Sequence, residues 1–300
     1  MSGALPEELP FMFAATVDVH FTKQGSFWPI GGPSEIPFNM IPVIENSGGG
    51  AFVNASVEKV LFEEERATGV SINGNKIYAS HIISTIGLLE TTKYLLPPEM
   101  ILNSQIQKHM SRLQPGLTVF YAFIILDGTK EELGLNHSTT WHFEHQDLGH
   151  TCKNWLNKGV AEALLDPLPE LAVGCNSAKD PYWERSENHV GKSTLSAMIP
   201  ANWEWFEEFI NAPEDQRSPK YEKIKMAFGK KVMDKVLNLY PRLRDHVEHI
   251  EFKTPLNHFD CLGKHKGGIY GLRPNMARFD DPGMCIMVVS LFMELFSIYF

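Results

Sequence analysis

The stretch from Gly25 to Val60, GSFWPIGGPSEIPFNMIPVIENSGGGAFVNASVEKV, most constrains what this chain can fold into. It predicts a glycine turn, a helix, a glycine stop and a strand, in that order. Ser34 suits the N-cap of the helix, and Pro37 is tolerated near its start. The glycines from Gly48 to Gly50 end the helix. This order of elements is that of the second half of a dinucleotide-binding fold.

The residues after the glycines continue the strand pattern. AFVNASVEKVLFEEE, residues 51–65, alternates apolar and polar side chains as a strand does. GVSINGNKIYASHIISTIG then predicts a hairpin, because Asn73-Gly74 is the turn pair between two alternating runs.

The first half of a dinucleotide-binding fold is not visible. Such a fold begins with a strand and a Gly-x-Gly-x-x-Gly loop whose backbone N–H groups hold the pyrophosphate. That motif does not occur in the sequence. We therefore expect the chain to be the central part of a longer protein.

The middle of the chain predicts a different kind of domain. Residues 117–126, 138–145 and 193–200 indicate strands, 201–210 the start of a helix, and 218–243 the best helix of the chain. Strands and helices mix without a regular βαβ rhythm, so the predicted fold class is α/β with an α+β substrate domain. The first twenty residues are rich in Pro and Phe and predict an irregular segment that packs onto other parts of the protein.

Composition narrows the class of protein. With 43% hydrophobic and 21% charged residues the chain is globular, and its net charge of −9 with scattered basic residues argues against nucleic acid as a partner. The four cysteines, Cys152, Cys175, Cys261 and Cys285, are too dispersed for a disulfide scaffold. No signal peptide is visible at the start.

The last seventeen residues form an apolar tail with one charge, Glu294. A tail of this length is slightly shorter than the roughly 20 residues of a membrane span. It predicts a short anchor, a buried strand pair or read-through past a true exon end, and we favour read-through.

Several motifs resemble one family when taken in order. They are GSFWPIGGPSEIPFNMIPVIENSGGG, ISTIGLLETTKYLLP, SRLQPGLTVFYAFIILDGTKEELGL, SAKDPYWE, EWFEEF and GGIYGLRPNMARF. The sequence resembles the retinol saturase family, in the phytoene desaturase and carotenoid isomerase group of flavoproteins. The resemblance covers the chain from about Leu5 to Phe279. The Gly-Gln-Asp segment that closes this family's sequences is missing.

The resemblance implies an FAD-dependent oxidoreductase. The reaction would be hydride transfer from reduced flavin to the 13,14 double bond of all-trans-retinol or a related retinoid or carotenoid polyene, with NAD(P)H as a possible source of electrons. It also implies peripheral association with the endoplasmic reticulum membrane and an elongated apolar substrate pocket. The alternative is a non-catalytic, truncated module that binds a retinoid or carotenoid or pairs with another subunit. The sequence does not give the oligomeric state.

The resemblance divides the chain into four parts. Residues 1–98 would be a partial, incomplete FAD-binding (Rossmann-like) domain, 99–255 the α+β substrate domain, 256–283 a segment returning to the FAD domain, and 284–300 the apolar tail.

The same resemblance nominates candidate site residues. Val57 would place backbone groups near the adenine of FAD, although an ordinary strand valine explains it equally well. The segment from Ser84 and Thr85 through Ile86 to Gly87 would return toward the cofactor, although a plain strand exit fits almost as well. The remaining cofactor candidates are Gly31, Gly32, Gly268 and Gly271, the last two in a turn with Gly267 that would let backbone approach a flat ligand.

Tyr270, in the same glycine-rich turn, is the candidate proton donor. Tyrosine is a poor acid unless its environment shifts its pKa, so a structural tyrosine is the favoured reading. The histidines His137, His142, His145 and His150 cluster in sequence but lack His-Glu-x-x-His spacing, so no metal site is predicted. No Gly-x-Ser-x-Gly motif supports hydrolase chemistry.

Overall fold

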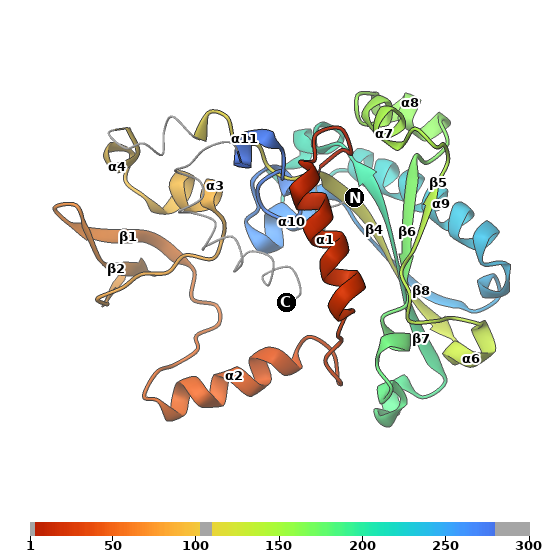
Figure 1. Ribbon diagram of the computed structural model, residues 1–300, viewed down its shortest axis with the longest axis horizontal. Coiled ribbons are helices and arrows are strands. Elements are labelled where there is room, and N and C mark those ends of the chain that lie inside the picture. The colour runs from red at the N-terminus through yellow and green to blue at the C-terminus, as the bar shows by residue number, and fades with distance from the viewer. Residues whose placement is uncertain (1–3, 103–109, 280–300) are drawn as a thin grey trace.

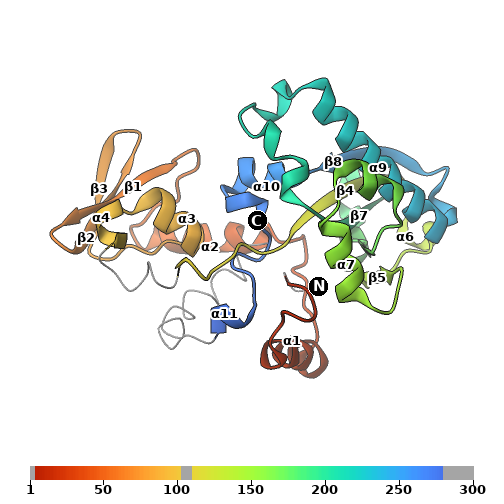
Figure 2. The same ribbon diagram turned by 90° about the horizontal axis from the view of Figure 1, so that it is seen from above.

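The computed structural model describes residues 4–102 and 110–279 (Figure 1). They form two lobes, each built on an antiparallel sheet, with α10 (Pro255–Leu262) and α11 (Met276–Phe279) between them (Figure 2). The mixture of helix and sheet agrees with the predicted class.

The small lobe holds a three-stranded sheet in the order β1-β2-β3. Its strands are β1 (Val57–Glu63), β2 (Arg66–Ile72) and β3 (Asn75–Tyr78). Asn73 and Gly74 have φ values of 50° and 76°, as a type I′ turn requires. The predicted hairpin is confirmed. The short helices that follow are α3 (Leu88–Glu90), the π-helix η1 (Thr91–Leu95) and α4 (Pro98–Leu102).

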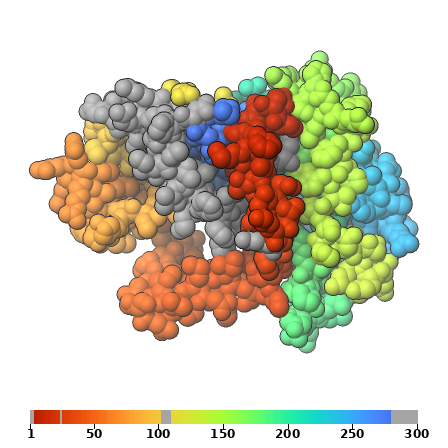
Figure 3. Space-filling model, viewed as in Figure 1, coloured from red at the N-terminus to blue at the C-terminus, as the bar shows by residue number. Residues whose placement is uncertain are grey.

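The predicted helix after the glycine turn is α2 (Glu35–Asn46). Ser34 precedes it, but its side chain makes no capping hydrogen bond. No residue of α2 is buried, and Phe38 and Val43 are 71% and 65% exposed. In the space-filling view α2 extends along one edge of the molecule (Figure 3).

The expectation of irregular structure over the first twenty residues holds for residues 4–10 and is wrong from Phe11 onward. Helix α1 (Phe11–Gln24) follows Pro10 and has no hydrogen-bonding side chain at its N-cap. Without a cap or a strong apolar stripe, the sequence carried little signal for this helix. The expected packing of the segment onto other parts is confirmed at Leu5, which is buried with Leu117 and Cys152.

The large lobe holds a five-stranded sheet in the order β5-β6-β7-β4-β8, antiparallel at every pair. Its strands are β4 (Thr118–Asp127), β5 (Thr140–Phe143), β6 (Glu170–Gly174), β7 (Lys192–Ala201) and β8 (Val247–Lys253). The sequence predicted β4, β5 and β7 but not β6 or β8. A wholly antiparallel sheet with helices on one side agrees with the α+β prediction for this part.

The long helix α9 (Pro219–Leu239) covers one face of this sheet and confirms the predicted helix. Phe228, Val232 and Val236 on its apolar stripe are fully buried. Phe228 contacts Phe120 of β4, with ring centroids 6.1 Å apart. The core of the large lobe therefore lies between α9 and this face of the sheet.

The expected helix over 201–210 is corrected to two short 3₁₀ turns, η5 (Trp203–Trp205) and η6 (Glu207–Phe209). Trp203, Trp205 and Phe206 are all buried, so this segment follows the core surface rather than one helix face. The remaining helices are α6 (Lys130–Leu133), α7 (Leu148–Leu156) and α8 (Val160–Leu165). The remaining 3₁₀ turns are η2 (Ser177–Lys179), η3 (Trp183–Arg185), η4 (Glu187–His189), η7 (Glu214–Gln216), η8 (Pro241–Leu243) and η9 (His265–Gly267).

The described residues of the small lobe contain no parallel βαβ unit. The partial FAD-binding domain and the three boundaries between the four predicted parts remain predictions. The apolar tail, residues 284–300, lies outside the described residues, as does Cys285. Among the described residues no helix combines the length and apolar character needed to span a membrane.

Candidate functional site

The candidate substrate surface is the face of the large sheet that points away from α9. Successive residues of a strand point to opposite faces. Phe120 of β4 therefore points toward α9, whereas Phe123 and Ile125 lie on the other face and are 42% and 38% exposed. We call this surface the open face. It is lined by aromatic and apolar side chains of β4, β5 and β7, namely Tyr121, Phe123, Ile125, Trp141, Phe143 and Met198.

Strand register brings these residues into rows. Tyr121 pairs with Met198 on one side and with Lys253 on the other, and the row continues through Ala172 to Trp141. The rings of Tyr121 and Phe123 stack with centroids 5.4 Å apart. The open face therefore carries an apolar strip that crosses the sheet.

A shallow pocket of about 180 Å³ lies at one end of this strip. Phe123 and Ile125 contribute apolar surface, and side chains of the flanking strands contribute polar groups. The polar lining residues are Asn176, Thr194, Ser196, His249 and Glu251.

The predicted glycine-rich turn lies at the other end of the strip. Gly116 N–H donates to Gly271 O at 2.8 Å, and Ile269 N–H donates to Leu117 O at 2.9 Å. A Cβ on Gly116 would lie 1.9 Å from Ile269 O. The turn is thus held against the start of β4 by backbone contact.

Tyr270 has φ 62° and Gly271 has φ 66°. A left-handed conformation is unusual for a bulky residue and is often found at functional sites. Gly267 and Gly268 do allow close approach, but to protein backbone: their Cβ positions lie 2.3 Å from Pro255 O and 3.0 Å from Gly116 O. Tyr270 remains a candidate proton donor, and a structural role remains the favoured prediction.

His258 of α10 connects the glycine turn to the open face, and sequence reasoning missed it. Its Nδ1 lies 3.3 Å from Gly267 O, and its ring centroid lies 5.6 Å from that of Tyr121. Burial lowers the pKa of His258. The hydrogen bond to the Gly267 carbonyl raises it, but by less. The residues that surround it are far apart in sequence, so spacing gave no signal.

The predicted segment Ser84–Gly87 joins the same neighbourhood from the small lobe. Gly87 has φ 115°, and a Cβ there would lie 2.2 Å from Oε2 of the buried Glu90. Glu90 accepts a hydrogen bond from His265 N–H at 2.7 Å, and Lys264 Nζ donates to Ile86 O at 2.7 Å. The structure therefore brings Gly87 close to the start of the glycine turn.

The other candidates of the small lobe lie near this segment. Ser84 Oγ is 2.6 Å from Thr91 Oγ1, and Thr85 is exposed. Val57 pairs with Ile72 in the edge strand β1, which packs against η1. Val57, Ser84, Thr85 and Gly87 therefore belong to one structural unit.

Gly31 and Gly32 lie elsewhere. Gly31 N–H donates to Asp180 Oδ2 at 2.9 Å, and Lys179 Nζ lies 4.9 Å from the centroid of the Trp28 ring. Two of the family-like motifs, GSFWPIGG and SAKDPYWE, thus contact each other at the edge of the large lobe.

The predicted flavin residues form an incomplete site. A pyrophosphate needs several free backbone N–H groups at a turn or helix start. Gly31 N–H is bonded to Asp180, and the close approaches at Gly87, Gly267 and Gly268 are filled by protein atoms. The described residues therefore do not form a complete site for FAD, and the cofactor roles of these residues stay predictions.

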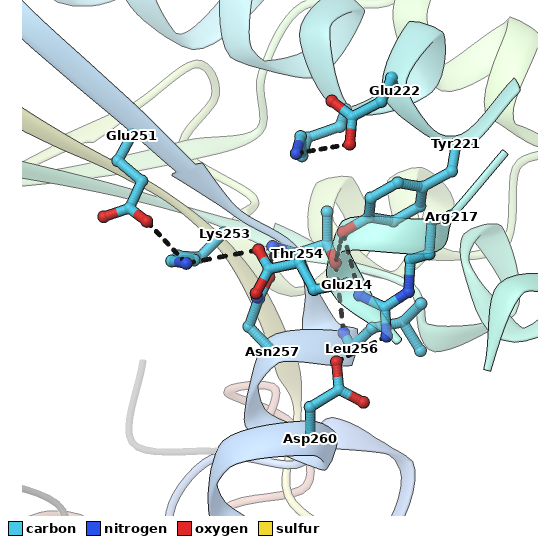
Figure 4. A network of polar contacts seen from close by, with 11 residues as sticks. Glu214, Arg217, Tyr221, Glu222, Glu251, Lys253, Thr254, Leu256, Asn257 and Asp260 are labelled. Atoms are coloured by element: carbon cyan, nitrogen blue, oxygen red, sulfur yellow. Dashed lines mark hydrogen bonds and ion pairs between the residues drawn. The ribbon is translucent and has the colours of Figure 1, made fainter. Parts of the chain in front are cut away.

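A polar network beneath α10 fixes the position of that helix (Figure 4). The side chain of Arg217 is fully buried and pairs with Asp260 at 2.5 Å. Burial alone would lower the pKa of Arg217, but its contacts with Asp260 and Tyr221 raise it. Tyr221 Oη lies 3.0 Å from Oγ1 of Thr254, which caps α10. The network thereby holds His258 in place.

The four clustered histidines do not converge. His142 of β5 faces Tyr240, with ring centroids 6.1 Å apart, and burial and the nearby Lys235 lower its pKa. Within residues 4–102 and 110–279 no group of three or more His, Cys, Asp or Glu side chains could hold a metal ion.

Sequence comparison identifies the relatives of this chain. All-trans-retinol 13,14-reductase of Danio rerio is 34% identical over 282 residues, 92% of this chain and 46% of the relative. The chain is related in sequence to the all-trans-retinol 13,14-reductases. The predicted resemblance to the retinol saturase family is thereby confirmed. The chain spans about half the length of the curated relatives it matches.

Two further relatives widen the comparison. A Danio rerio protein named inactive all-trans-retinol 13,14-reductase is 31% identical over 85% of this chain and 42% of its own length. Prolycopene isomerase 2 of an Oncidium hybrid cultivar is 25% identical over 86% of this chain and 39% of its own length, which agrees with the carotenoid isomerase group. No protein-family model matches the chain. An oxidoreductase structure from Methanosarcina mazei covers 75% of this chain and 43% of its own, at 15% identity and a TM-score of 0.42, a level that does not establish a shared fold.

Proposed function

We propose that this chain supplies the substrate-binding part, and some of the cofactor-binding part, of an FAD-dependent oxidoreductase that reduces the 13,14 double bond of all-trans-retinol or a related polyene. The open face beside the glycine turn carries the proposal, because an elongated apolar strip suits a polyene. The similarity to all-trans-retinol 13,14-reductase over 92% of the chain supports the choice of substrate and cofactor.

Each part of the chain has a proposed task in this reaction. Reduced FAD, when bound, supplies the two electrons, with NAD(P)H as the proposed source. Tyr121, Phe123 and Trp141 hold the polyene and keep water from it. Tyr270 donates the proton of its phenolic O–H to one carbon of the 13,14 double bond, and the hydride goes to the other carbon. The proposed cofactor contacts are the small-lobe residues Val57, Ser84, Thr85 and Gly87. The other four residues predicted from the sequence, Gly31, Gly32, Gly268 and Gly271, lie outside that unit and are not proposed as contacts.

The proposal is tested in two steps on the purified chain joined to a segment that carries the Gly-x-Gly-x-x-Gly loop of a dinucleotide-binding fold. Mixing with FAD and removing free flavin should leave protein with a flavin absorbance band. Adding all-trans-retinol under reducing conditions should then give a product saturated at the 13,14 bond, identified by chromatography and mass spectrometry. A protein that binds retinol, stays colourless with FAD and forms no product would overturn the flavoenzyme assignment.

A non-catalytic binding module is the second candidate. Two observations favour it: the described residues do not form a complete flavin site, and one of the relatives is named inactive. Quenching of protein fluorescence by retinol without any FAD binding is the result expected for this module. If the chain pairs with a longer subunit, mixing the two proteins should change the amount of flavin that is bound.

Association with the endoplasmic reticulum membrane is part of the same proposal. It is supported by exposed apolar residues of α1 and α2, namely Phe11, Met12, Phe38, Met40 and Val43. Fractionation of cells that express the tagged chain should place the chain with endoplasmic reticulum membranes. Recovery of the chain from another fraction would contradict the proposed membrane association.

A further inference from the structure

The loop between α6 and β5 carries a motif for the attachment of a sugar. Asn136, His137 and Ser138 fit the pattern Asn-x-Ser/Thr, in which x is any residue except proline. We propose that Asn136 carries an N-linked glycan, donated by a lipid-linked pyrophosphate oligosaccharide, and that the large lobe therefore lies in the lumen of the endoplasmic reticulum. The inference goes beyond the proposed function, because it concerns a modification and a compartment and needs neither flavin nor polyene.

The loop presents Asn136 to solvent. Leu133 is buried and Leu135 packs against the core of the large lobe, so the chain is anchored just before the motif. Residues 136–139 are all exposed, and β5 begins at Thr140. A glycan is bulky and hydrophilic and belongs on a protein surface. This loop offers such a position without the displacement of any buried side chain.

A local hydrogen bond orients the Asn136 side chain. Its Oδ1 accepts from Ser138 N–H at 2.9 Å, which is the hydrogen bond of an Asx turn. The amide oxygen is thereby held against the backbone, which leaves the amide nitrogen Nδ2 on the outer side of the turn. No hydrogen-bond acceptor for Nδ2 occurs among the residues that the structure describes. The atom that would take the sugar is therefore accessible.

The attachment is a substitution at the anomeric carbon of the first sugar. Nδ2 of Asn136 forms a bond to this carbon, and the bond from the carbon to the pyrophosphate oxygen breaks. The lipid pyrophosphate leaves with the electron pair of that bond, and Nδ2 loses one proton to a base of the transferase. No atom is oxidised or reduced, so the step requires only the lipid-linked donor and the transferase.

A glycan at Asn136 would also shield an edge of the large sheet. Among the described strands β5 pairs only with β6, so its outer edge presents unpaired backbone groups. Asn136 lies four residues before β5, a distance of at most about 14 Å along the chain. Exposed strand edges tend to pair with other chains, and proteins protect them in several ways. An attached sugar would hinder such pairing sterically.

A second motif of the same kind gives an internal comparison. Asn54, Ala55 and Ser56 also fit the pattern, and Asn54 is exposed. Its φ is 54°, and within the described part of the chain its side chain accepts no Asx-turn hydrogen bond. Asn54 also lies three residues before Val57, a proposed cofactor contact that a glycan would crowd. We therefore expect a glycan on Asn136 and none on Asn54.

The test measures the electrophoretic mobility of the tagged chain. All 300 residues are expressed in animal cells behind a cleavable signal peptide, and the extract is treated with peptide N-glycosidase. The wild type should shift to lower mass by one glycan, and peptide mass spectrometry should find Asn136 converted to aspartate. Asn136→Gln and Ser138→Ala should each abolish the shift, because they remove the nitrogen and the hydroxyl of the motif.

Two further variants are the matched controls. Ser138→Thr keeps a hydroxyl in the motif and should keep the shift. Asn54→Gln removes the second motif and should leave the shift unchanged. All these substitutions are at exposed positions, so each deglycosylated variant should have the melting temperature of the deglycosylated wild type.

The protein isolated from the cells that naturally make it should carry the same glycan. Three results would overturn the inference: no glycan on Asn136 of the signal-directed wild type, an unmodified Asn136 in the naturally made protein, or a shift of wild-type size in Asn136→Gln. None of these measurements uses FAD or retinol. The glycan assignment therefore stands or fails independently of the flavin and product tests.

Discussion

Burial sets the reactivity of the cysteine side chains. Cys152 is fully buried, and its Sγ lies 3.7 Å from the carboxylate of Glu170. Burial, followed by the negative charge of Glu170, raises the pKa of Cys152 to about 12. Cys175 is also buried, whereas Cys261 is exposed. Because the thiolate is the reactive form, these thiols should differ in labelling rate.

We expect iodoacetamide at neutral pH to label Cys261 before Cys175 and to leave Cys152 unmodified in the folded chain. Peptide mapping by mass spectrometry after timed labelling measures this order. The same experiment in denaturant is the control, since unfolding should make the rates similar. Rapid labelling of native Cys152 would show that its side chain is accessible to the reagent.

Gly116 marks a place where two backbones meet. The position that a Cβ would take lies 1.9 Å from Ile269 O, and a backbone oxygen cannot move as a flexible side chain can. Gly116→Ala should therefore displace the glycine turn and cost about 1–3 kcal/mol of unfolding free energy. Denaturant unfolding measures the loss.

Gly159→Ala provides the comparison, because no atom lies within 4 Å of the added methyl group and its φ is −69°. It should cost less than about 1 kcal/mol, mainly through a weaker N-cap for α8. Equal losses in the two variants would contradict the close contact of Gly116 with the turn.

At the scale of elements, the buried Arg217 ties the loop before α9 to α10. Its guanidinium has 0% exposed side-chain area, so loss of its carboxylate partner leaves a buried charge with weaker contacts. Asp260→Asn should cost about 1.5–3 kcal/mol, as expected for a hydrogen bond to a charged group. Thermal and denaturant unfolding measure this change.

Glu208→Gln is the comparison, because it breaks an ion pair on the surface of the protein. Lys220 and Glu208 are 63% and 55% exposed, and such surface pairs contribute about 0–1 kcal/mol. The Asp260 variant should therefore be clearly the less stable of the two. Similar losses would mean that burial of Arg217 does not set the strength of its pair.

The elements that sequence predicted well are those with a local signal. The stripe of α9, the alternation of β4 and β7 and the Asn73-Gly74 turn each contain their pattern within one segment. β6 is buried along its whole length and β8 is only half-buried, so neither alternates clearly. Helix α1 lacks a cap, and the segment Trp203–Phe209 buries residues on several sides.

The candidate site was predictable only where a motif was continuous. The glycine turn and Tyr270 stand together in GGIYGL, and the segment Ser84–Gly87 stands at a strand exit. His258 and the pocket residues come from separate strands and helices, and they meet only through sheet register. The contact of Gly31 with Asp180 likewise joins distant segments. Predictions for the eight cofactor residues stay open until a flavin is bound.

At the scale of the molecule, the partly buried His258 links stability to pH. Burial lowers the pKa of His258 below its ordinary value of 6.5. Between the lowered pKa and 6.5 the unfolded chain binds more protons than the folded one. Stability is therefore full above about pH 6.5 and is lost as the pH falls through the folded pKa.

We expect His258→Gln to show a smaller loss of stability between neutral pH and pH 5 than the wild type. Denaturant unfolding at a series of pH values measures the slope. His20→Gln, on the exposed part of α1, is the control and should follow the wild-type curve. A His258 variant with the wild-type slope would assign the pH dependence to other groups.

The strand order of the large sheet also has a consequence for synthesis of the protein. β4 is the first strand of its sheet to be made, yet it lies between β7 and β8, which are made last. At typical translation rates it waits on the order of ten seconds for β8. Meanwhile this mostly apolar strand has both edges unpaired and is open to aggregation. The yield of folded protein should therefore depend on how well chaperones shield β4 on the ribosome.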